Sequence, residues 1–251
     1  MLELVGIEKK YGGLAAVHDC SYQVSGTGIT CLIGPNGAGK TTTFNLVSGF
    51  ERCDAGEIRF EGAKISDLPA HQIARRGLVR TFQIPRSLHG LTVLESVKMA
   101  PSNDALERIW APYLFFRRVM RRERELDDRA REALDFVGLL QKAGADAGTL
   151  SGGQKKLLEL ARAIVFEARL VLLDEPTAGV NIAIIANIVR LLRRLRDRKI
   201  ALFIVEHNME FVREISDHVV VMAEGAPLTQ GTFDNIRAHP LVVEAYLGRS
   251  S

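Results

Sequence analysis

The sequence predicts an α/β fold with a mostly parallel sheet, an N-terminal antiparallel β lobe and a helical lobe. Residues 34–41 are rich in glycine and lie between a strand-like apolar run and a helix-like run. Short apolar runs alternate with patterns of helical period in the second half of the chain, which is typical of a parallel sheet with its connecting helices. A charged stretch of helical pattern, residues 109–137, separates this half from the first.

The first part of the chain is predicted to form a β lobe that leads into the glycine-rich segment. Apolar and polar residues alternate on both sides of Tyr11-Gly12-Gly13, which indicates an antiparallel hairpin. Glu61-Gly62 indicates a second, shorter hairpin. The elements expected here are strands at 2–7, 16–24, 29–33, 56–60 and 64–65, a helix at 69–76 and a strand at 78–82.

Residues 88–147 are predicted to form the helical lobe. Helical patterns cover 93–99 and 109–137, and Pro101 lies between them as a helix breaker. The apolar segment Trp110–Phe116 has two interpretations, as core packing or as an exposed docking surface. We expect one domain, 1–251, with the core and β lobe at about 1–86 and 168–251 and the helical lobe at about 87–167.

The last part of the chain is predicted to complete the parallel sheet. Residues 170–173 are continuously apolar, as in strands that are buried on both faces. Pro227 suits an edge strand, because proline has no N–H to donate to a neighbouring strand. The elements expected here are a helix at 151–166 with Ser151 as its N-cap, a helix at 182–196, and strands at 170–173, 200–205, 218–222 and 227–230.

Composition argues against several classes of protein. The chain has 33 Lys and Arg against 30 Asp and Glu, and a net charge of +3 gives no argument for nucleic acid as a partner. Cys20, Cys31 and Cys53 lack metal-ligand spacing, so we expect reduced thiols in a cytosolic protein. No export signal is visible, and the longest apolar runs fall far short of the roughly 20 residues that span a bilayer. If the protein works at a membrane, another chain must provide the span.

The glycine-rich segment fits the pattern G-x-x-x-x-G-K-[ST] from Gly34 to Thr41. Glycines let successive N–H groups turn inward, and the following helix offers its positive end to an anion. We expect Lys40 to reach the β- and γ-phosphates of a bound polyphosphate and the Thr41 hydroxyl to bind Mg²⁺. The alternative is a glycine-rich turn without a ligand. The residues predicted to bind the nucleotide here are Asn36, Gly37, Ala38, Gly39, Lys40, Thr41 and Thr42.

Asp174 and Glu175 follow the predicted strand 170–173 directly, so both carboxylates are expected at the edge where open α/β sheets bind ligands. Asp174 would hold Mg²⁺ directly or through water, and Glu175 would orient and deprotonate the attacking water. The alternative is a pair of charges at the start of a helix.

Leu150-Ser151-Gly152-Gly153-Gln154 supplies a hydroxyl and two glycines at the start of a second helix. Such a helix end can bind an anion, and a simple phosphate-loop kinase or GTPase has no use for a second one. The most economical role is therefore contact with the γ-phosphate of a nucleotide that another copy holds. The alternative is an N-cap with a flexible glycine pair.

Taken together and in this order, the segments 34–41, 150–154 and 170–175 resemble the nucleotide-binding subunit of an ABC (ATP-binding cassette) transporter. The resemblance implies a P-loop nucleoside triphosphatase core that binds ATP with Mg²⁺ and hydrolyses it. It also implies that Ser151, Gly152, Gly153 and Gln154 contact the nucleotide.

The resemblance gives roles to three further residues. Tyr11 matches the aromatic residue that stacks on adenine, although its ring could instead pack on its own lobe. Gln83 matches the glutamine that touches Mg²⁺ or the attacking water and reports to the membrane subunit. His207 matches the histidine that contacts the γ-phosphate. The sequence departs from the family at Asn181, where many relatives have Asp, and an amide there could keep a contact but not a charge.

A closer resemblance, to the ATPases of branched-chain amino-acid importers, rests on Ser48-Gly49-Phe50 and on the segments 80–86, 91–95, 205–209 and 243–248. It implies an ATPase that drives import of branched-chain or related amino acids. The implied partners are a second copy or a paralogue, membrane permease subunits and a soluble substrate-binding protein, with the chain peripheral on the inner face of the cell membrane. The alternatives are the ATPase of a lipid or lipopolysaccharide exporter and an ABC ATPase without a transport role.

Overall fold

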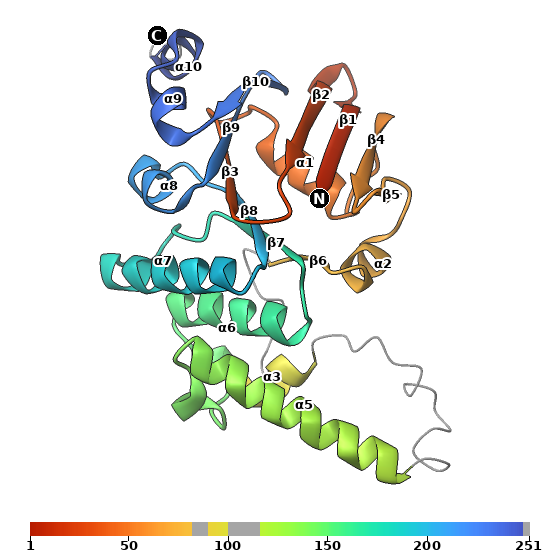
Figure 1. Cartoon of the computed structure of the whole chain (residues 1–251), viewed down its shortest axis with the longest axis vertical. Coiled ribbons are helices and arrows are strands. Elements are labelled where there is room, and N and C mark those ends of the chain that lie inside the picture. Colours follow the sequence, from red (N-terminus) through yellow and green to blue (C-terminus); the bar gives the residue numbers. More distant parts are fainter. Residues whose placement is uncertain (82–89, 100–115, 248–251) are drawn as a thin grey trace. The chain divides into compact units, whose positions relative to one another are not determined.

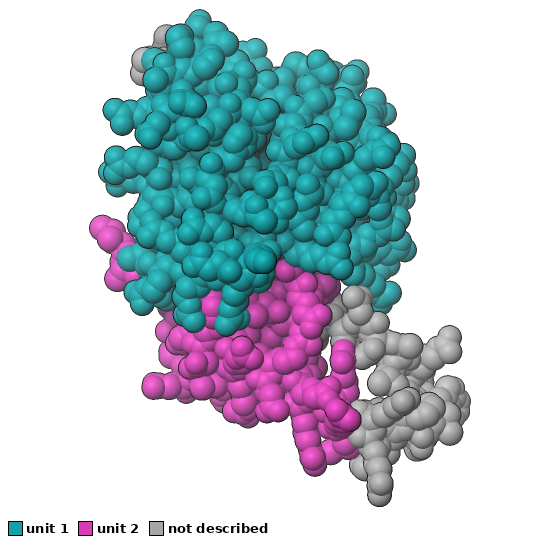
Figure 2. Space-filling view, in the orientation of Figure 1, with its two compact units in different colours: residues 1–81, 169–178, 185–251 teal, residues 82–168, 179–184 magenta. Residues whose placement is uncertain are grey.

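The structure is a computed structural model and describes residues 1–81, 90–99 and 116–247. The chain divides into two compact units, which Figure 2 shows in different colours. Unit 1 comprises residues 1–81, 169–178 and 185–251, and unit 2 comprises 82–168 and 179–184.

A six-stranded sheet forms the centre of unit 1, with the strand order β10-β9-β3-β8-β7-β6 (Figure 1). Five strands are parallel, and β10 is antiparallel to β9 at the edge. The strands are β3 (Ile29–Ile33), β6 (Leu78–Arg80), β7 (Leu170–Asp174), β8 (Ala201–Val205), β9 (His218–Ala223) and β10 (Ala226–Gly231). Since β3 and β8 are buried at every position, their continuous apolar runs suit a sheet that is covered on both faces. The predicted mostly parallel sheet is confirmed.

A second, four-stranded antiparallel sheet with the order β2-β1-β4-β5 forms the N-terminal β lobe. Its strands are β1 (Leu2–Tyr11), β2 (Leu14–Val24), β4 (Ala55–Phe60) and β5 (Ala63–Lys64). One hydrophobic core joins this lobe to the parallel sheet within unit 1. Phe203 of β8 belongs to this core, with the Phe44 ring centroid 4.9 Å away and the Tyr22 ring edge-on at 6.1 Å.

The helices of unit 1 follow the strands as the alternating pattern predicts. The helices that lie in unit 1, or mostly so, are α1 (Lys40–Val47), α2 (Ala70–Arg75), α7 (Ile182–Asp197), α8 (Met209–Ile215), α9 (Phe233–Arg237) and α10 (Pro240–Leu247). The last three are absent from the sequence prediction, because each is too short to show a clear helical period.

Unit 2 is helical. It contains α3 (Val93–Lys98), α5 (Phe116–Phe136), α6 (Gly152–Val165) and the 3₁₀ turns Leu140–Lys142 and Ala147–Thr149. The three α-helices pack against one another around buried residues that include Val97, Leu134 and Leu158. Most of the apolar segment Trp110–Phe116 lies outside the described residues. No helix in the described ranges is long and apolar enough to cross a bilayer.

Candidate nucleotide-binding and hydrolysis site

The segment between β3 and α1 has the backbone of a phosphate-binding loop. Gly34, Gly37 and Gly39 have φ angles of 151°, 81° and 92°, which side-chain-bearing residues rarely adopt. A Cβ on Gly34 would lie 2.1 Å from the Met222 carbonyl oxygen, and one on Gly39 would lie 2.5 Å from the Ala16 carbonyl oxygen. Glycine is therefore required at both positions by conformation and by space.

The Lys40 ammonium group lies over this loop. Its Nζ donates hydrogen bonds to the Gly34 and Pro35 carbonyl oxygens, at 2.7 and 2.9 Å. Burial lowers the pKa of Lys40 below its usual value, and the negative charges of Glu175 and Asp174 partly oppose that decrease. The two predicted acids thus lie close enough to Lys40 to act on its charge, although more than 130 residues separate them in sequence.

Asp174 is the last residue of β7, and its carboxylate is almost completely buried. Its Oδ2 accepts a hydrogen bond of 2.8 Å from Arg80, the last residue of the neighbouring strand β6. Arg80 also donates to Asn45 Oδ1 and Ser48 Oγ, at 2.7 and 3.2 Å. Arg80 therefore connects Asp174 to the helix that follows the phosphate loop and to its C-cap, a connection that the sequence did not reveal.

Glu175 and His207 face each other across the ends of β7 and β8. The distance between His207 Nδ1 and Glu175 Oε1 is 3.7 Å, and the His207 side chain is 60% exposed. Glu175 has a φ of 46°, an uncommon value for a residue with a side chain, and its N–H donates to the Val205 carbonyl oxygen at 3.0 Å. The backbone thus turns sharply where the predicted general base leaves the sheet.

Tyr11 lies at the end of β1 with its ring half exposed, and the Lys9 ammonium is 5.7 Å from the ring centroid. Its hydroxyl donates to Glu51 Oε2, and Glu51 Oε1 accepts a 2.7 Å hydrogen bond from Asn45. Burial and then the bond and charge of Glu51 raise the pKa of Tyr11. The Tyr11 ring is thus exposed enough to stack on another planar ring, and the hydrogen bond to Glu51 fixes its hydroxyl group.

These residues fit a magnesium-nucleotide complex. The ranges 1–81, 90–99 and 116–247 contain no cluster of three or more His, Cys, Asp or Glu that could hold a metal by itself. Mg²⁺ in nucleotide sites usually takes one or two protein groups and completes its shell with phosphate oxygens and water. The hydroxyl of Thr41 and the carboxylate of Asp174 are donors of the required kind.

The segment 150–154 lies in unit 2 and begins α6. The Ser151 hydroxyl accepts a hydrogen bond from the Gln154 N–H, and the Gln154 side chain accepts one from the Ser151 N–H, at 3.3 and 3.1 Å. This capping box gives Ser151 the helix-capping role that was the alternative interpretation. In this role the oxygen of the Ser151 hydroxyl accepts a hydrogen bond, while its proton can still be donated to another group.

Asn181, in the same unit, also caps a helix. Its Oδ1 accepts a hydrogen bond of 2.9 Å from the Ile184 N–H, so this residue caps α7.

Comparison with known proteins identifies the family. The model of the ABC transporter family matches residues 17–178, well over half of the chain. The chain belongs to the ABC transporter family. It is an ABC-type ATPase, as the three motifs predicted.

Two relatives match this ABC protein over nearly all of both chains. A probable branched-chain amino acid transport ATP-binding protein, LivG of Archaeoglobus fulgidus, is 41% identical over 99% of this chain and 95% of its own length. A high-affinity branched-chain amino acid transport ATP-binding protein, BraF of Pseudomonas aeruginosa, is 39% identical over 100% and 98%. A crystal structure described as the ADP conformation of an ATP-binding cassette of an ABC transporter has a TM-score of 0.83, at 32% identity and 99% coverage of both chains.

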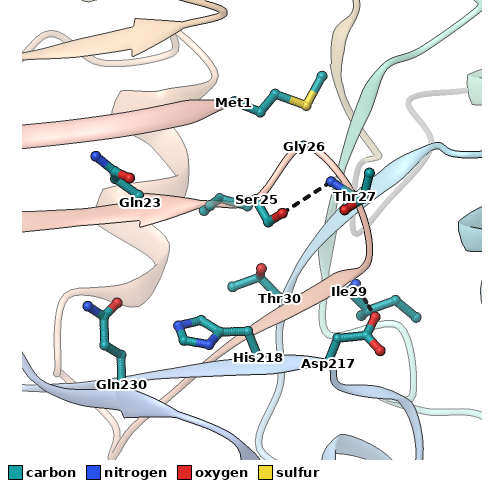
Figure 3. Close-up of a pocket in the computed structure, with 11 residues that line it drawn as sticks. Met1, Gln23, Ser25, Gly26, Thr27, Ile29, Thr30, Asp217, His218 and Gln230 are labelled. Atoms are coloured by element: carbon teal, nitrogen blue, oxygen red, sulfur yellow. Dashed lines mark hydrogen bonds between the residues drawn. The ribbon is translucent and has the colours of Figure 1, made fainter.

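A pocket of about 650 Å³ lies elsewhere on unit 1 of the ABC protein (Figure 3). Figure 3 shows Gln23, Thr30, His218 and Gln230 around it, with Asp217 accepting a 2.8 Å hydrogen bond from the Ile29 N–H. Ile29 begins β3, whereas the phosphate loop follows the last residue of the same strand. Because open α/β sheets bind ligands at the carboxyl ends of their strands, this pocket is not the nucleotide site.

Gln83, the other predicted residue of the hydrolysis site, lies outside the described residues.

Proposed function

We propose that this chain is the ATP-hydrolysing subunit of a transporter that imports branched-chain or related amino acids. The observation that carries the proposal is the full-length similarity, at 39–41% identity, to two ATP-binding proteins named for branched-chain amino acid transport. The site residues support the hydrolytic part, because a phosphate loop, a metal-binding carboxylate and a second carboxylate lie within one unit.

In this proposal, ATP lies along the phosphate loop with its adenine against the exposed ring of Tyr11. Asn36, Gly37, Ala38 and Gly39 present N–H groups to the phosphates, and the α1 N-terminus adds its positive end. Lys40 leaves the loop carbonyls and pairs with the β- and γ-phosphates. Thr41 and Asp174 would hold Mg²⁺, which would supply positive charge to the transferring phosphoryl group. Thr42 follows Thr41 on α1 and is proposed to contact the nucleotide.

Glu175 acts as the general base in the proposed reaction. Its carboxylate takes a proton from the water that attacks the γ-phosphorus, and His207 donates a hydrogen bond to the γ-phosphate. The 3.7 Å separation of these two side chains would place the base and the phosphate contact next to each other. Gln83 is proposed to contact the same water or Mg²⁺.

The site in one chain is only half complete. We propose that Ser151, Gly152, Gly153 and Gln154 of a second copy, or of a paralogue, cover the γ-phosphate from the other side. ATP would then hold the two chains together, and hydrolysis would release them. Membrane permease subunits would receive this movement, a soluble substrate-binding protein would deliver the amino acid, and the chain would be peripheral on the inner face of the membrane.

Replacing Glu175 with Gln tests the hydrolytic assignment. The amide cannot accept the proton of the attacking water, so we expect turnover to fall by roughly a hundredfold or more while ATP still binds. The ATPase rate and the ATP dissociation constant of the purified chain are measured for the variant and for Glu210→Gln, which changes an exposed glutamate of α8. Undiminished turnover in Glu175→Gln would contradict the assignment of the base.

The transported substrate needs a separate experiment. The complex is purified from native membranes with its permease and binding protein, and its ATPase rate is measured in vesicles with leucine, isoleucine or valine. We expect stimulation by these amino acids in the presence of the binding protein. Stimulation by a lipid or lipopolysaccharide instead would favour the ATPase of an exporter.

A further inference from the structure

A buried carboxylate next to the hydrolysis site has no role in the reaction described above. Glu206 follows β8, directly before His207, and its side chain is 0% exposed. Within the described ranges, the one side-chain nitrogen within ion-pair distance of it is His207 Nδ1, at 3.9 Å. A buried carboxylate without a close cation needs several hydrogen-bond donors, since burial removes its water.

The two oxygens of Glu206 accept four hydrogen bonds, two each. Oε1 accepts from the N–H and the hydroxyl of Thr177, at 2.9 and 2.6 Å. Oε2 accepts from the N–H groups of His207 and Asn208, at 2.9 and 3.1 Å. Asn208 in turn caps α8, because its side chain accepts from the Phe211 N–H. Each oxygen of the Glu206 carboxylate thus accepts two hydrogen bonds. Oε1 binds the loop that follows β7, and Oε2 binds the loop that follows β8.

The two loops are those that carry the proposed reactive side chains. Thr177 lies two residues after Glu175 in the loop that follows β7, and His207 is the second residue of the loop that follows β8. The Glu175 N–H also donates to the Val205 carbonyl oxygen, so the strand ends are joined beside the carboxylate. Beside these bonds, His207 Nδ1 lies 3.7 Å from Glu175 Oε1, although the His207 side chain is largely exposed.

We propose that Glu206 is a positioning residue that holds the base Glu175 and the phosphate-contacting His207 at a fixed separation. The proposal rests on the proposed function, because it takes the roles of those two residues from it. Two acceptor oxygens are essential to this task. A glutamine offers one acceptor oxygen, and its NH₂ group would face two further N–H or O–H donors, so it can hold only one of the two loops.

Glu206→Gln in the full chain tests the proposal through turnover. We expect kcat to fall by roughly tenfold to a hundredfold, because small displacements of reacting groups cost that much, with ATP affinity changed less than about threefold. Glu210→Gln is the matched control, since it makes the same change at an exposed position four residues along. A kcat within about twofold of wild type, or an equal loss in the control, overturns the proposal.

A double-mutant cycle shows whether Glu206 acts through His207. His207→Ala, Glu206→Gln and the double variant are compared by kcat. If Glu206 positions His207, the loss in the double variant is clearly smaller than the product of the two single losses. Single losses that multiply fully would mean that the two residues act independently, and the proposal fails.

The imidazole signals of His207 give a readout that does not depend on hydrolysis. The chain has six histidines, so the His207 ¹H–¹³C signals are assigned by their loss in His207→Ala. We expect these signals to shift in Glu206→Gln and not in Glu210→Gln. If the wild-type chain hydrolyses no ATP, the proposed function fails, whereas unchanged His207 signals in Glu206→Gln overturn the positioning role itself.

A second variant keeps the test decisive if Glu206→Gln does not fold. Thr177→Val has nearly the same shape but removes the hydroxyl that donates the 2.6 Å hydrogen bond. Three of the four hydrogen bonds remain, so we expect a kcat loss of about threefold together with a shift of the His207 signals. Wild-type kcat and unshifted signals in a folded Thr177→Val chain overturn the proposal.

Discussion

Arg80 illustrates how a single residue can organise the site although it lies outside the segments 34–41, 150–154 and 170–175. Its side chain is 12% exposed and that of its partner Asp174 is 6% exposed, so the ion pair is largely shielded from water. The guanidinium carbon lies 5.8 Å from the ring centroids of both Phe44 and Phe50. Arginine suits this position because a planar guanidinium can pack on aromatic rings while it donates along its edges.

Replacing Arg80 with Met is expected to lower the free energy of unfolding by about 3 kcal/mol. Removing one partner of a buried ion pair leaves the other charge buried and unpaired, which is the costly outcome. The double variant Arg80→Met with Asp174→Asn should recover roughly half of that loss, because neither charge then remains. Urea denaturation of the full chain, followed by circular dichroism, measures both quantities.

The matched control is Arg59→Met. Arg59 also pairs with a neighbouring carboxylate, that of Glu57, but these side chains are 44% and 31% exposed, so water screens the pair. We expect its unfolding midpoint to stay close to that of wild type. Equal destabilisation by the Arg80 and Arg59 variants would mean that burial of the Arg80–Asp174 pair does not matter.

The cysteines differ in how much thiolate they can form. Burial, with smaller effects of neighbouring charges, raises the pKa of Cys20 to about 12 and raises that of Cys31 further. The pKa of half-buried Cys53 is raised less strongly, again mainly by burial. At pH 8 a thiol with a pKa of 12 is ionised in only about one molecule in 10⁴.

Iodoacetamide at pH 8 is therefore expected to label Cys53 first in the native chain. Cys20 and Cys31 should react only after unfolding, since a raised pKa leaves the unreactive thiol and the fold excludes the reagent. Mass spectrometry of peptides from chains labelled for increasing times measures the order. Labelling of Cys20 as fast as Cys53 would contradict its burial.

At the scale of residues, the sequence predicted those whose chemistry is local. Gly34 to Thr41 is recognisable because spacing, glycine and lysine all lie within one short segment, and Asp174-Glu175 because a buried strand precedes it. Arg80 and Glu206 could not be predicted in the same way. Asp174, the ion-pair partner of Arg80, and Thr177, one hydrogen-bond partner of Glu206, lie 94 and 29 residues away in sequence, so only the pairing of strands brings them together.

Among the elements, α6 combines a structural and a proposed binding role at one end. A Cβ added to Gly152 meets no atom within 4 Å, whereas one added to Gly153 would lie 2.4 Å from Ile184 Cδ1. Both glycines are helical, and neither has a positive φ. The two adjacent glycines therefore differ in their surroundings, since only Gly153 lies close against another side chain of its unit.

Replacing each glycine with alanine is expected to change the free energy of unfolding differently at the two positions. Gly153→Ala should lower the free energy of unfolding by about 1–3 kcal/mol, because the Ile184 side chain must move to admit the methyl group. Gly152→Ala should leave it unchanged or raise it by up to about 1 kcal/mol, since alanine restricts the unfolded chain. Chemical denaturation of the two variants checks the difference, and equal effects would contradict the close contact with Ile184.

The elements that the sequence predicted well are those with strong periodicity or continuous burial. Strands β3, β7 and β8 and helices α6 and α7 match their predicted ranges to within about two residues. The predicted edge strand with Pro227 is β10, which pairs with β9 at the edge of the six-stranded sheet. Helices α8 and α9 escaped prediction even though Asn208 and Thr232 cap them, because a cap without a following period is a weak signal.

For the whole molecule, the division of the motifs between two units is the feature with the largest functional consequence. The phosphate loop, Asp174, Glu175 and His207 lie in unit 1, whereas Ser151 and its neighbours lie in unit 2. Family membership shows what kind of ATPase this is. An experiment with two chains is needed to test whether Ser151 and its neighbours in one chain contact the nucleotide that the phosphate loop of the other chain binds. The sequence predicts this partnership in two ways: from the second helix end at Ser151, whose most economical role is contact with a nucleotide that another copy holds, and from the resemblance.

The mass of the ATP-bound form provides that test. With Glu175→Gln, ATP persists, so light scattering should report a particle of twice the mass of the single chain with ATP and Mg²⁺, and a monomer without them. Adding Ser151→Arg should return the particle to a monomer that still binds ATP, because the large side chain would block the partner's phosphates while the phosphate loop stays intact. Ser151→Ala removes the same helix cap, at a cost of about 1 kcal/mol, and the proposed hydroxyl contact, but it does not block that space, so its dimer should be weaker yet still form. A dimer that persists with Ser151→Arg would mean that α6 does not face the nucleotide of the second chain.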